Sequence, residues 1–301
     1  MSNILMCKDI AVYNIDEEKV LNYNLLPGLM QKVPSKYVFD IWMDIRRAEN
    51  SLSVKLKNDK YQGLSNLEID KLTYALSLSD CYWVKNEEDT IKFEEISPYF
   101  VKIDKSEPNL YLQGYLPKEW VDSKTLNKYG DIHIETECFK LCKMLDIPCA
   151  EIKDIENGVS VKNITDTKLM LEQANMSGKI NPYDFTEADI LSLFGLQGLQ
   201  MLVIDAIVGN GDRHAGNFAW LRDTDTGEYV SMSPLYDFDH ALDSKREIDV
   251  MLSELVKIIK DNKKYCEETL RICNTVITIN TEEIFIIRAK NLIKLLKEEV
   301  K

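Results

Sequence analysis

The sequence predicts an α+β fold with two lobes, a small mixed N-lobe followed by a mainly helical C-lobe. The chain has 301 residues, of which 45% are hydrophobic, so it can bury a substantial core in one large domain or two lobes. Residues 101–165 show short strand-like runs around one helical stretch, whereas 166–301 are mostly helical in pattern. We therefore expect an accessory part of the N-lobe in 1–100, the N-lobe core in 101–165 and the C-lobe in 166–301.

The first of these sections, residues 1–100, shows no chemistry of its own. YVFDIWMDIRRAEN has the apolar spacing of an amphipathic helix. Trp42 and Trp83 are expected to be core aromatic residues rather than ligand platforms. Arg46 and Arg47 are expected to be solvated charges at the end of the helix.

Residues 209–218, GNGDRHAGNF, carry the polar pattern of a phosphotransfer site. Asp212 is followed five residues later by Asn217, and Asp237 lies in YDFDHAL about twenty residues further on. In protein kinases an Asp accepts the proton of the attacking hydroxyl, an Asn five residues on holds Mg²⁺, and a later Asp holds the metal across the β- and γ-phosphates. Asp212, Asn217 and Asp237 fit these roles in order, so Asn217 and Asp237 are the predicted metal ligands.

The flanking sequence predicts the scaffold that such a loop needs. LFGLQGLQMLVIDAIVGN is apolar enough to be a buried helix, and it ends at Gly209, a residue type that closes helices through a left-handed turn. FAWL and YVSMSPLY have the pattern of strands joined by the turn RDTDTGE, a hairpin that would bring Asn217 and Asp237 together. A lone Asp after Gly is more often a turn residue than a base, but the joint pattern is much rarer.

The helix, the GNGD turn, the Arg-His pair, Asn217 and the PLYDFD segment together resemble the catalytic core of the HipA-like toxin kinases. They resemble the DRHxxN loop of phosphatidylinositol kinases more distantly. The resemblance covers roughly 100–245, and the first hundred residues only by general arrangement. It implies a bilobal, protein-kinase-like serine/threonine kinase that uses ATP and Mg²⁺. It also implies a phosphate-covering loop at Gly114 and Lys118, with Tyr111 at the place of a serine that regulates the best-known members.

The N-lobe is expected to supply a lysine for the α- and β-phosphates and a carboxylate that holds this lysine extended. Lys128 in LNKYG and Glu135 in DIHIETECFKLCKMLDIP are the predicted pair, with Glu135 preferred to Glu137. Only six residues separate the two, fewer than in the better-known family members. Lys118 and Lys124 therefore compete with Lys128 for this role.

Three further residues complete the predicted site. His214 is expected to orient the loop through hydrogen bonds rather than transfer protons, because Asp212 already fills the position of the base. Arg213 could contact phosphate or Asp237, or form an ordinary salt bridge. Asn210 is expected to be one of the residues that bind the cofactor.

Charge and cysteine usage exclude several other classes of function. The formal net charge of −13 repels phosphate backbones, so direct nucleic-acid binding is not expected. The seven cysteines form no CxxC pair, and Cys138 and Cys142 are expected to be buried helix thiols rather than zinc ligands. The odd cysteine count and the absence of a long apolar segment favour a cytoplasmic protein without a membrane span.

Two alternatives to a protein kinase remain open at this stage. A nucleotide-binding regulator without catalysis is favoured by the short Lys128-to-Glu135 segment, and a lipid or small-molecule kinase by the phosphoinositide-kinase-like loop. The resemblance implies a protein substrate, which in this family is often a translation component. It also implies a candidate antitoxin partner, because family members are often encoded beside a small DNA-binding protein.

Overall fold

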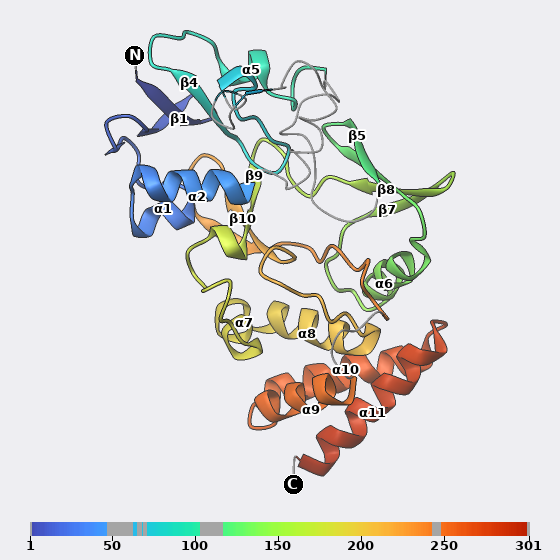
Figure 1. The fold of residues 1–301 in the computed structure, drawn as a ribbon. Helices are drawn as coiled ribbons and strands as arrows, with labels where there is room; N and C mark the ends of the chain where they lie inside the picture. The colour runs from blue at the N-terminus through green and yellow to red at the C-terminus, as the bar shows by residue number, and fades with distance from the viewer. Residues whose placement is uncertain are drawn as a thin grey trace. The chain divides into compact units, whose positions relative to one another are not determined.

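The computed structural model divides the chain into two compact units, each built from three separate stretches of sequence. It describes residues 2–46, 63–64, 68, 71–102, 117–242 and 248–299 (Figure 1). The first unit comprises Met1–Gly130, Lys153–Lys179 and Ala219–Ser231. The second unit comprises Asp131–Ile152, Ile180–Phe218 and Met232–Lys301. The section expected to form the N-lobe core, 101–165, therefore contributes to both units.

The first unit begins with a four-stranded antiparallel sheet in the order β3-β2-β1-β4. Its strands are β1 (Asn3–Cys7), β2 (Ile10–Asn14), β3 (Lys19–Val20) and β4 (Tyr82–Asn86). The helices of the same region are α1 (Gly28–Lys32), α2 (Lys36–Arg46) and α5 (Phe93–Ile96). Helix α2 is the expected amphipathic helix. Trp42 and Trp83 are 1% and 0% exposed, which confirms that they are core residues.

Arg46 corrects one expectation, because its side chain is only 7% exposed and is not a solvated charge. Its guanidinium forms an ion pair with Asp80 at 2.8 Å and donates a hydrogen bond to the carbonyl of Tyr82 at 2.9 Å. It also lies over the ring of Trp42, 5.4 Å from the ring centroid. The partner carboxylate is 34 residues away in sequence, so the helix pattern alone carried no sign of it. Arg47 lies outside the described residues.

Two further sheets provide the remaining strands. One has the order β5-β6-β8-β7, with β5 (Lys118–Asp122), β6 (Thr125–Tyr129), β7 (Ile152–Ile155) and β8 (Gly158–Lys162). The other has the order β11-β10-β9, with β9 (Leu169–Gln173), β10 (Ala219–Asp223) and β11 (Tyr229–Met232), and the short 3₁₀ helix η3 (Ala174–Met176) follows β9. Strands β10 and β11 are the hairpin that the sequence predicts, and this prediction is confirmed.

A buried arginine joins the N-terminal segment to the third sheet within the first unit. Arg222 on β10 is 0% exposed and donates hydrogen bonds to the carbonyls of Asn24 and Leu26 at 2.5 and 2.7 Å. It also contacts Glu172 on β9 at 3.3 Å. Glu172 in turn accepts the backbone N–H of Gly28 at 2.5 Å. A buried charge is tolerated only when it is paired and hydrogen-bonded, and this cluster meets that requirement.

The second unit is mainly helical and surrounds helix α8. Its helices are α6 (His133–Met144), α7 (Glu187–Phe194), α8 (Leu196–Val208), α9 (Ile248–Ile259), α10 (Lys263–Thr278) and α11 (Glu283–Glu299). Helices α7, α9, α10 and α11 all contact α8 (Figure 1). Most residues of α8 are buried. Cys138 and Cys142 on α6 are fully buried, as expected. None of the helices in the described ranges is long and apolar enough to cross a membrane.

Candidate phosphotransfer site

The candidate site begins where helix α8 ends, at Gly209. Gly209 has a left-handed conformation (φ 70°, ψ 43°), which a residue with a side chain adopts only at a cost. A Cβ atom at this position would also lie 2.5 Å from Nη1 of Arg288. Arg288 donates to the carbonyl of Ile207, and the N–H of Leu242 donates to the carbonyl of Val208. The last turn of α8 is thus satisfied, and the chain reverses into the loop as predicted.

The loop from Asp212 to Asn217 closes on itself through hydrogen bonds. The N–H of His214 donates to the carbonyl of Asp212 at 2.8 Å, and the N–H of Asn217 donates to the carbonyl of His214 at 2.9 Å. The side-chain amide nitrogen of Asn217 donates to the Asp212 carbonyl at 3.1 Å. The five-residue spacing therefore joins the predicted base and the predicted ligand in one turn. Because the amide nitrogen is used in this bond, the amide oxygen of Asn217 is the atom suited to accept a metal ion.

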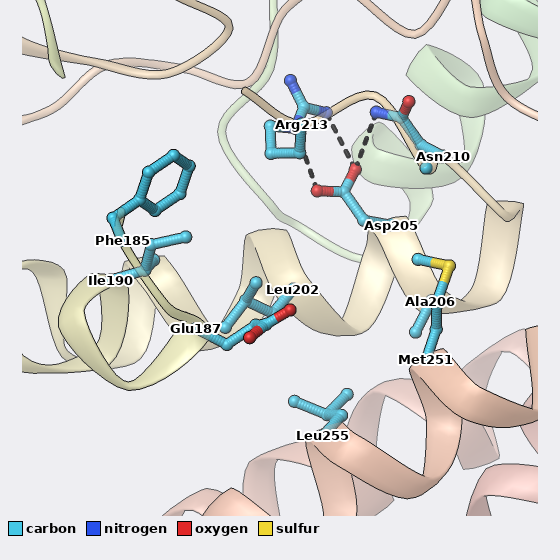
Figure 2. A pocket seen from close by; sticks show the side chains of 11 residues that line it. Phe185, Glu187, Ile190, Leu202, Asp205, Ala206, Asn210, Arg213, Met251 and Leu255 are labelled. Carbon is cyan, nitrogen blue, oxygen red and sulfur yellow. Dashed lines mark hydrogen bonds and ion pairs between the residues drawn. The ribbon is translucent and has the colours of Figure 1, made fainter. Parts of the chain in front are cut away.

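Arg213 holds this loop to the segment that follows the hairpin. Its side chain is 6% exposed and binds both carboxylate oxygens of Asp205, at 2.8 and 2.9 Å (Figure 2). Its Nη1 donates to two backbone carbonyls, those of Asn217 and Tyr236, at 2.8 Å each. Of the roles considered for Arg213, the structure shows a salt bridge, and the partner is Asp205.

Burial and charge act in opposite directions on the Arg213 guanidinium. Burial lowers its pKa, but the negative charge and the hydrogen bonds of Asp205 raise it more, so that the pKa is raised overall. The guanidinium also lies over the ring of Phe238, 5.0 Å from the ring centroid. Arg213 is therefore a permanently charged anchor inside the second unit.

Asp237 lies between two anchored aromatic residues. The hydroxyl of Tyr236 donates to the carbonyl of Gly216 at 3.1 Å, and Phe238 is fully buried against Phe139, with ring centroids 5.4 Å apart. Asp237 itself has a positive φ of 63°, an uncommon conformation outside glycine. The backbone on both sides of this carboxylate is thus constrained, which is a property expected of a residue that must present its side chain in one direction.

His240 is a neighbour of the predicted base that sequence reasoning missed. Its Nε2 lies 3.9 Å from Oδ2 of Asp212, and both side chains are partly exposed. This distance is longer than a hydrogen bond. The signal in the sequence is slight, since His240 is simply three residues beyond Asp237. His214, by contrast, is exposed and accepts the N–H of Gly216 on Nδ1 at 3.0 Å.

The candidate phosphate-binding lysines all lie in the β5–β6 hairpin of the first unit. Lys118 and Lys128 are cross-strand partners in this hairpin, and Lys128 is 7% exposed. Because directly paired residues project to the same face of a sheet, these two cations share one face. Lys124 is exposed in the turn at the far end of the hairpin, where its N–H binds Asp122 at 2.8 Å.

The carboxylates of helix α6 differ in their surroundings. Glu135 is 2% exposed in the first turn of the helix, whereas Glu137 forms an ion pair with Lys140 at 2.9 Å. The pairing of Glu135 with Lys128 stays a prediction. Gly114 and Tyr111 lie outside the described residues.

The donor set of the site fits Mg²⁺ bound together with a nucleotide. Asp237 offers a carboxylate and Asn217 an amide oxygen, and Mg²⁺ in such sites takes few protein ligands and completes its shell with phosphates and water. Within the described ranges, no cluster of three or more His, Cys, Asp and Glu side chains is present that could form an all-protein metal cage. Asn217 and Asp237 are therefore two side chains that could hold Mg²⁺ beside a phosphate group.

A pocket of about 150 Å³ opens beside the loop within the second unit (Figure 2). Phe185, Ile190 and Leu255 contribute apolar walls. Asp205 and Arg213 form part of its polar edge, so their ion pair borders a space that solvent or a small group can enter.

Comparison with solved structures identifies the fold as the α+β protein-kinase-like fold with two lobes. HipA from the toxin–antitoxin system of Shewanella oneidensis MR-1, solved with HipB and its operator DNA, aligns with 99% of this chain and 96% of its own, with a TM-score of 0.57 and 11% identity. CtkA, a proinflammatory kinase of Helicobacter pylori, aligns with 62% of this chain and 91% of its own, with a TM-score of 0.38 and 17% identity. No protein-family model and no curated protein sequence matches the chain.

Proposed function

We propose that this chain is an ATP- and Mg²⁺-dependent serine/threonine protein kinase of the HipA-like type. The observation that carries the proposal is the position of Arg213, which binds the backbone of Asn217 and of Tyr236, the residue before Asp237. Two metal-binding side chains that are far apart in sequence thereby belong to one anchored structure with the base, Asp212. The shared fold with HipA supports the same function.

In the proposed reaction, a serine or threonine hydroxyl of a protein substrate attacks the γ-phosphorus of ATP. The new bond joins the hydroxyl oxygen to phosphorus, the bond from the γ-phosphorus to the bridging oxygen breaks, and ADP leaves. Asp212 orients the hydroxyl and accepts its proton. Asn217 and Asp237 would hold Mg²⁺, which supplies charge neutralisation between the β- and γ-phosphates when bound. Lys128 or Lys118 would neutralise the phosphates that are not transferred.

The direct test is ATP turnover and phosphoryl transfer by the purified chain and its Asp237→Ala variant. We expect turnover in the wild type and none in Asp237→Ala, with the fold retained, because Asp237 is partly exposed and is not part of the core. Asp225→Asn is the matched control, since Asp225 is an exposed hairpin carboxylate that pairs with Lys8. Full activity of Asp237→Ala would remove this residue from the mechanism.

The same assays separate the alternative functions. Binding of ATP with Mg²⁺ but no turnover would indicate a nucleotide-binding regulator. Transfer to phosphatidylinositol vesicles or a small molecule, with none to protein, would indicate a kinase of another class. A phosphoproteome comparison between cells expressing the wild type and cells expressing Asp212→Asn would identify the protein substrate, for which a translation component is the first candidate.

An antitoxin is the partner that the proposal adds. HipA was solved with HipB and operator DNA, so a small protein that binds this chain is the first partner to seek by co-purification. The acidic composition of the chain leaves DNA contacts to such a partner.

A further inference from the structure

We propose that Asp205 is a positioning residue for the phosphotransfer site, and that it aligns the base and both metal ligands through Arg213 and Asn210. This inference rests on the proposed function for its catalytic meaning. Asp205 is on the last turns of helix α8, one of the best-buried helices of the second unit, and is 3% exposed. It is thus a rigid point from which a loop can be held.

Both oxygens of the Asp205 carboxylate are used. Oδ1 accepts hydrogen bonds from Nη2 of Arg213 at 2.8 Å and from Nδ2 of Asn210 at 3.0 Å. Oδ2 accepts a hydrogen bond from Nε of Arg213 at 2.9 Å. Figure 2 shows the side chains of Arg213 and Asn210 converging on this one carboxylate. Such a fork of an arginine on a carboxylate fixes orientation as well as distance.

The first arm of this arrangement runs through Arg213 to the metal ligands. With Nε and Nη2 bound to Asp205, the guanidinium plane is set, and Nη1 points to the carbonyls of Asn217 and Tyr236. One planar group therefore sets the spacing between the loop and the segment that carries Asp237. A lysine at position 213 could not do this, because it lacks the planar fork.

The second arm runs through Asn210 to the base. Because Nδ2 of Asn210 donates to Asp205, its Oδ1 faces the other way and accepts the N–H of Asp212 at 3.4 Å. The backbone N–H of Asn210 also donates to the carbonyl of Asp205 at 2.9 Å. Asp205 thus acts on Asp212, Asn217 and Tyr236, the residue before Asp237, through the side chains of Asn210 and Arg213.

An amide in place of the carboxylate would not preserve this geometry. Asparagine has one acceptor oxygen and one NH₂ group, so at position 205 it would present donors to a site that already contains three donors. The guanidinium would also lose the charge that holds it in the interior. Asp205→Asn is therefore expected to loosen the whole site, although the predicted catalytic residues themselves are unchanged.

The test measures amide hydrogen exchange and metal-dependent nucleotide binding in the full chain. Without nucleotide, Asp205→Asn should speed exchange in the peptides covering 209–218 and 234–240 and leave α10 and α11 unchanged. With a fluorescent ATP analogue, the Mg²⁺ concentration for half-maximal binding should rise on the order of 10- to 100-fold, the usual effect of losing a residue that orients metal ligands. Glu268→Gln is the matched control, because Glu268 also binds a residue of α8, Gln200 at 2.7 Å, but far from the loop in sequence.

A second variant separates positioning from stability. Asp205→Leu combined with Arg213→Met removes the buried pair and should recover stability, as apolar replacements of buried pairs often do. If Asp205 acts by positioning, the recovered protein still shows fast amide exchange in the loop. It also still needs a raised Mg²⁺ concentration for half-maximal nucleotide binding. This double variant carries the test if Asp205→Asn does not fold.

Two results would overturn the inference. One is a folded Asp205→Asn protein whose loop amides exchange at the wild-type rate. The other is a double variant whose Mg²⁺ concentration for half-maximal nucleotide binding equals that of the wild type. Failure of the wild type to bind ATP with Mg²⁺ would refute the proposed function instead. The exchange measurement would still decide whether Asp205 holds the loop.

Discussion

At the scale of single residues, Asp212 combines the features of a catalytic base. Its backbone is bonded within the loop, its carboxylate is partly exposed to a substrate, and His240 lies 3.9 Å away. The backbone bonds fix where the carboxylate is, while the exposure allows a hydroxyl to approach. This is the combination that general-base catalysis needs, because geometry must be satisfied before proton affinity matters.

Replacing Asp212 by Asn should separate chemistry from binding. The amide keeps the size of the side chain but removes the acceptor charge, so phosphoryl transfer should fall by about 10²- to 10⁴-fold, the usual contribution of a general base. Affinity for ATP with Mg²⁺ should remain, since Asn217 and Asp237 are intact. Single-turnover transfer and nucleotide titration check the two expectations. Transfer at the wild-type rate would rule out Asp212 as the base.

The three lysines of the β5–β6 hairpin should differ in their effect on nucleotide binding. Lys128 is buried whereas Lys124 is exposed at the turn, so Lys128→Met should weaken binding most and Lys124→Met should not change it. Loss of one hydrogen bond to a charged group costs about 1.5–3 kcal/mol. Glu135→Gln should have a milder effect than Lys128→Met. A larger loss for Lys118→Met than for Lys128→Met, measured by the same titration, would reassign the role to its cross-strand neighbour.

At the scale of elements, the end of helix α8 and the loop that follows it form the frame of the candidate site within the second unit. The helix presents Asp205 and ends at Gly209, and the hairpin returns the chain to Tyr236. Arg213 then joins the two chain segments. The left-handed helix end at Gly209 therefore sets the direction in which the chain enters the loop that carries Arg213.

Replacing Gly209 by Ala should destabilise this helix end. A non-glycine residue in the left-handed region costs about 1–2 kcal/mol, and the new Cβ would also press on Arg288. Asn adds the same Cβ but tolerates this backbone conformation, so Gly209→Asn should lose less. Urea unfolding of the two variants measures the difference. Equal stability of Gly209→Ala and the wild type would mean that the helix end relaxes without strain.

At the scale of the whole molecule, the chain passes repeatedly between its two compact units. Each unit draws on three separate stretches of the sequence. Neither unit is therefore a continuous piece that could be cut out. In the second unit, the loop and the Asp237 segment are separated in sequence by the β10–β11 hairpin of the first.

Stability should fall in acid because several carboxyl groups have lowered pKa values. Hydrogen bonds lower the pKa of Asp16 (from the backbone of Asn3), of Asp189 (Thr186), of Asp223 (Thr226) and of Glu268 (Arg271) below the ordinary 3.8 for Asp and 4.5 for Glu. A lowered pKa means that the unfolded chain binds protons more readily, so this stability is present above the ordinary values and is lost as pH falls through the folded-state values.

Denaturant unfolding over a pH series checks this expectation. The contribution of these groups to the free energy of unfolding should be nearly constant at pH values just above 4.5, the ordinary pKa of Glu. It should decline below that pH. Asp189→Asn should make the decline shallower, because it removes one of the groups while Thr186 can still cap helix α7. A free energy of unfolding that rises as the pH falls would contradict the assignment.

Much of the local architecture of this protein can be predicted from its amino-acid sequence. The buried helix that ends at Gly209, the hairpin between Asn217 and Asp237, and the core positions of Trp42 and Trp83 follow from periodicity and turn residues. Backbone hydrogen bonds in helices and hairpins join residues near in sequence, so a local pattern is enough to predict them. The two-lobed α+β fold class was predicted in the same way and is confirmed by the likeness to HipA.

Which charged side chains are buried, and which partners they bind, depends on the packing of the folded chain. The helix pattern predicted a surface charge at Arg46, but its partner Asp80 comes from elsewhere in the chain. The loop pattern likewise did not indicate that Asp205 binds Arg213 or that His240 lies near Asp212. A charged side chain can leave water only where folding brings an opposite charge and hydrogen-bonding groups around it. Those partners come from separate elements, so their meeting is a property of the packed molecule and not of any one segment.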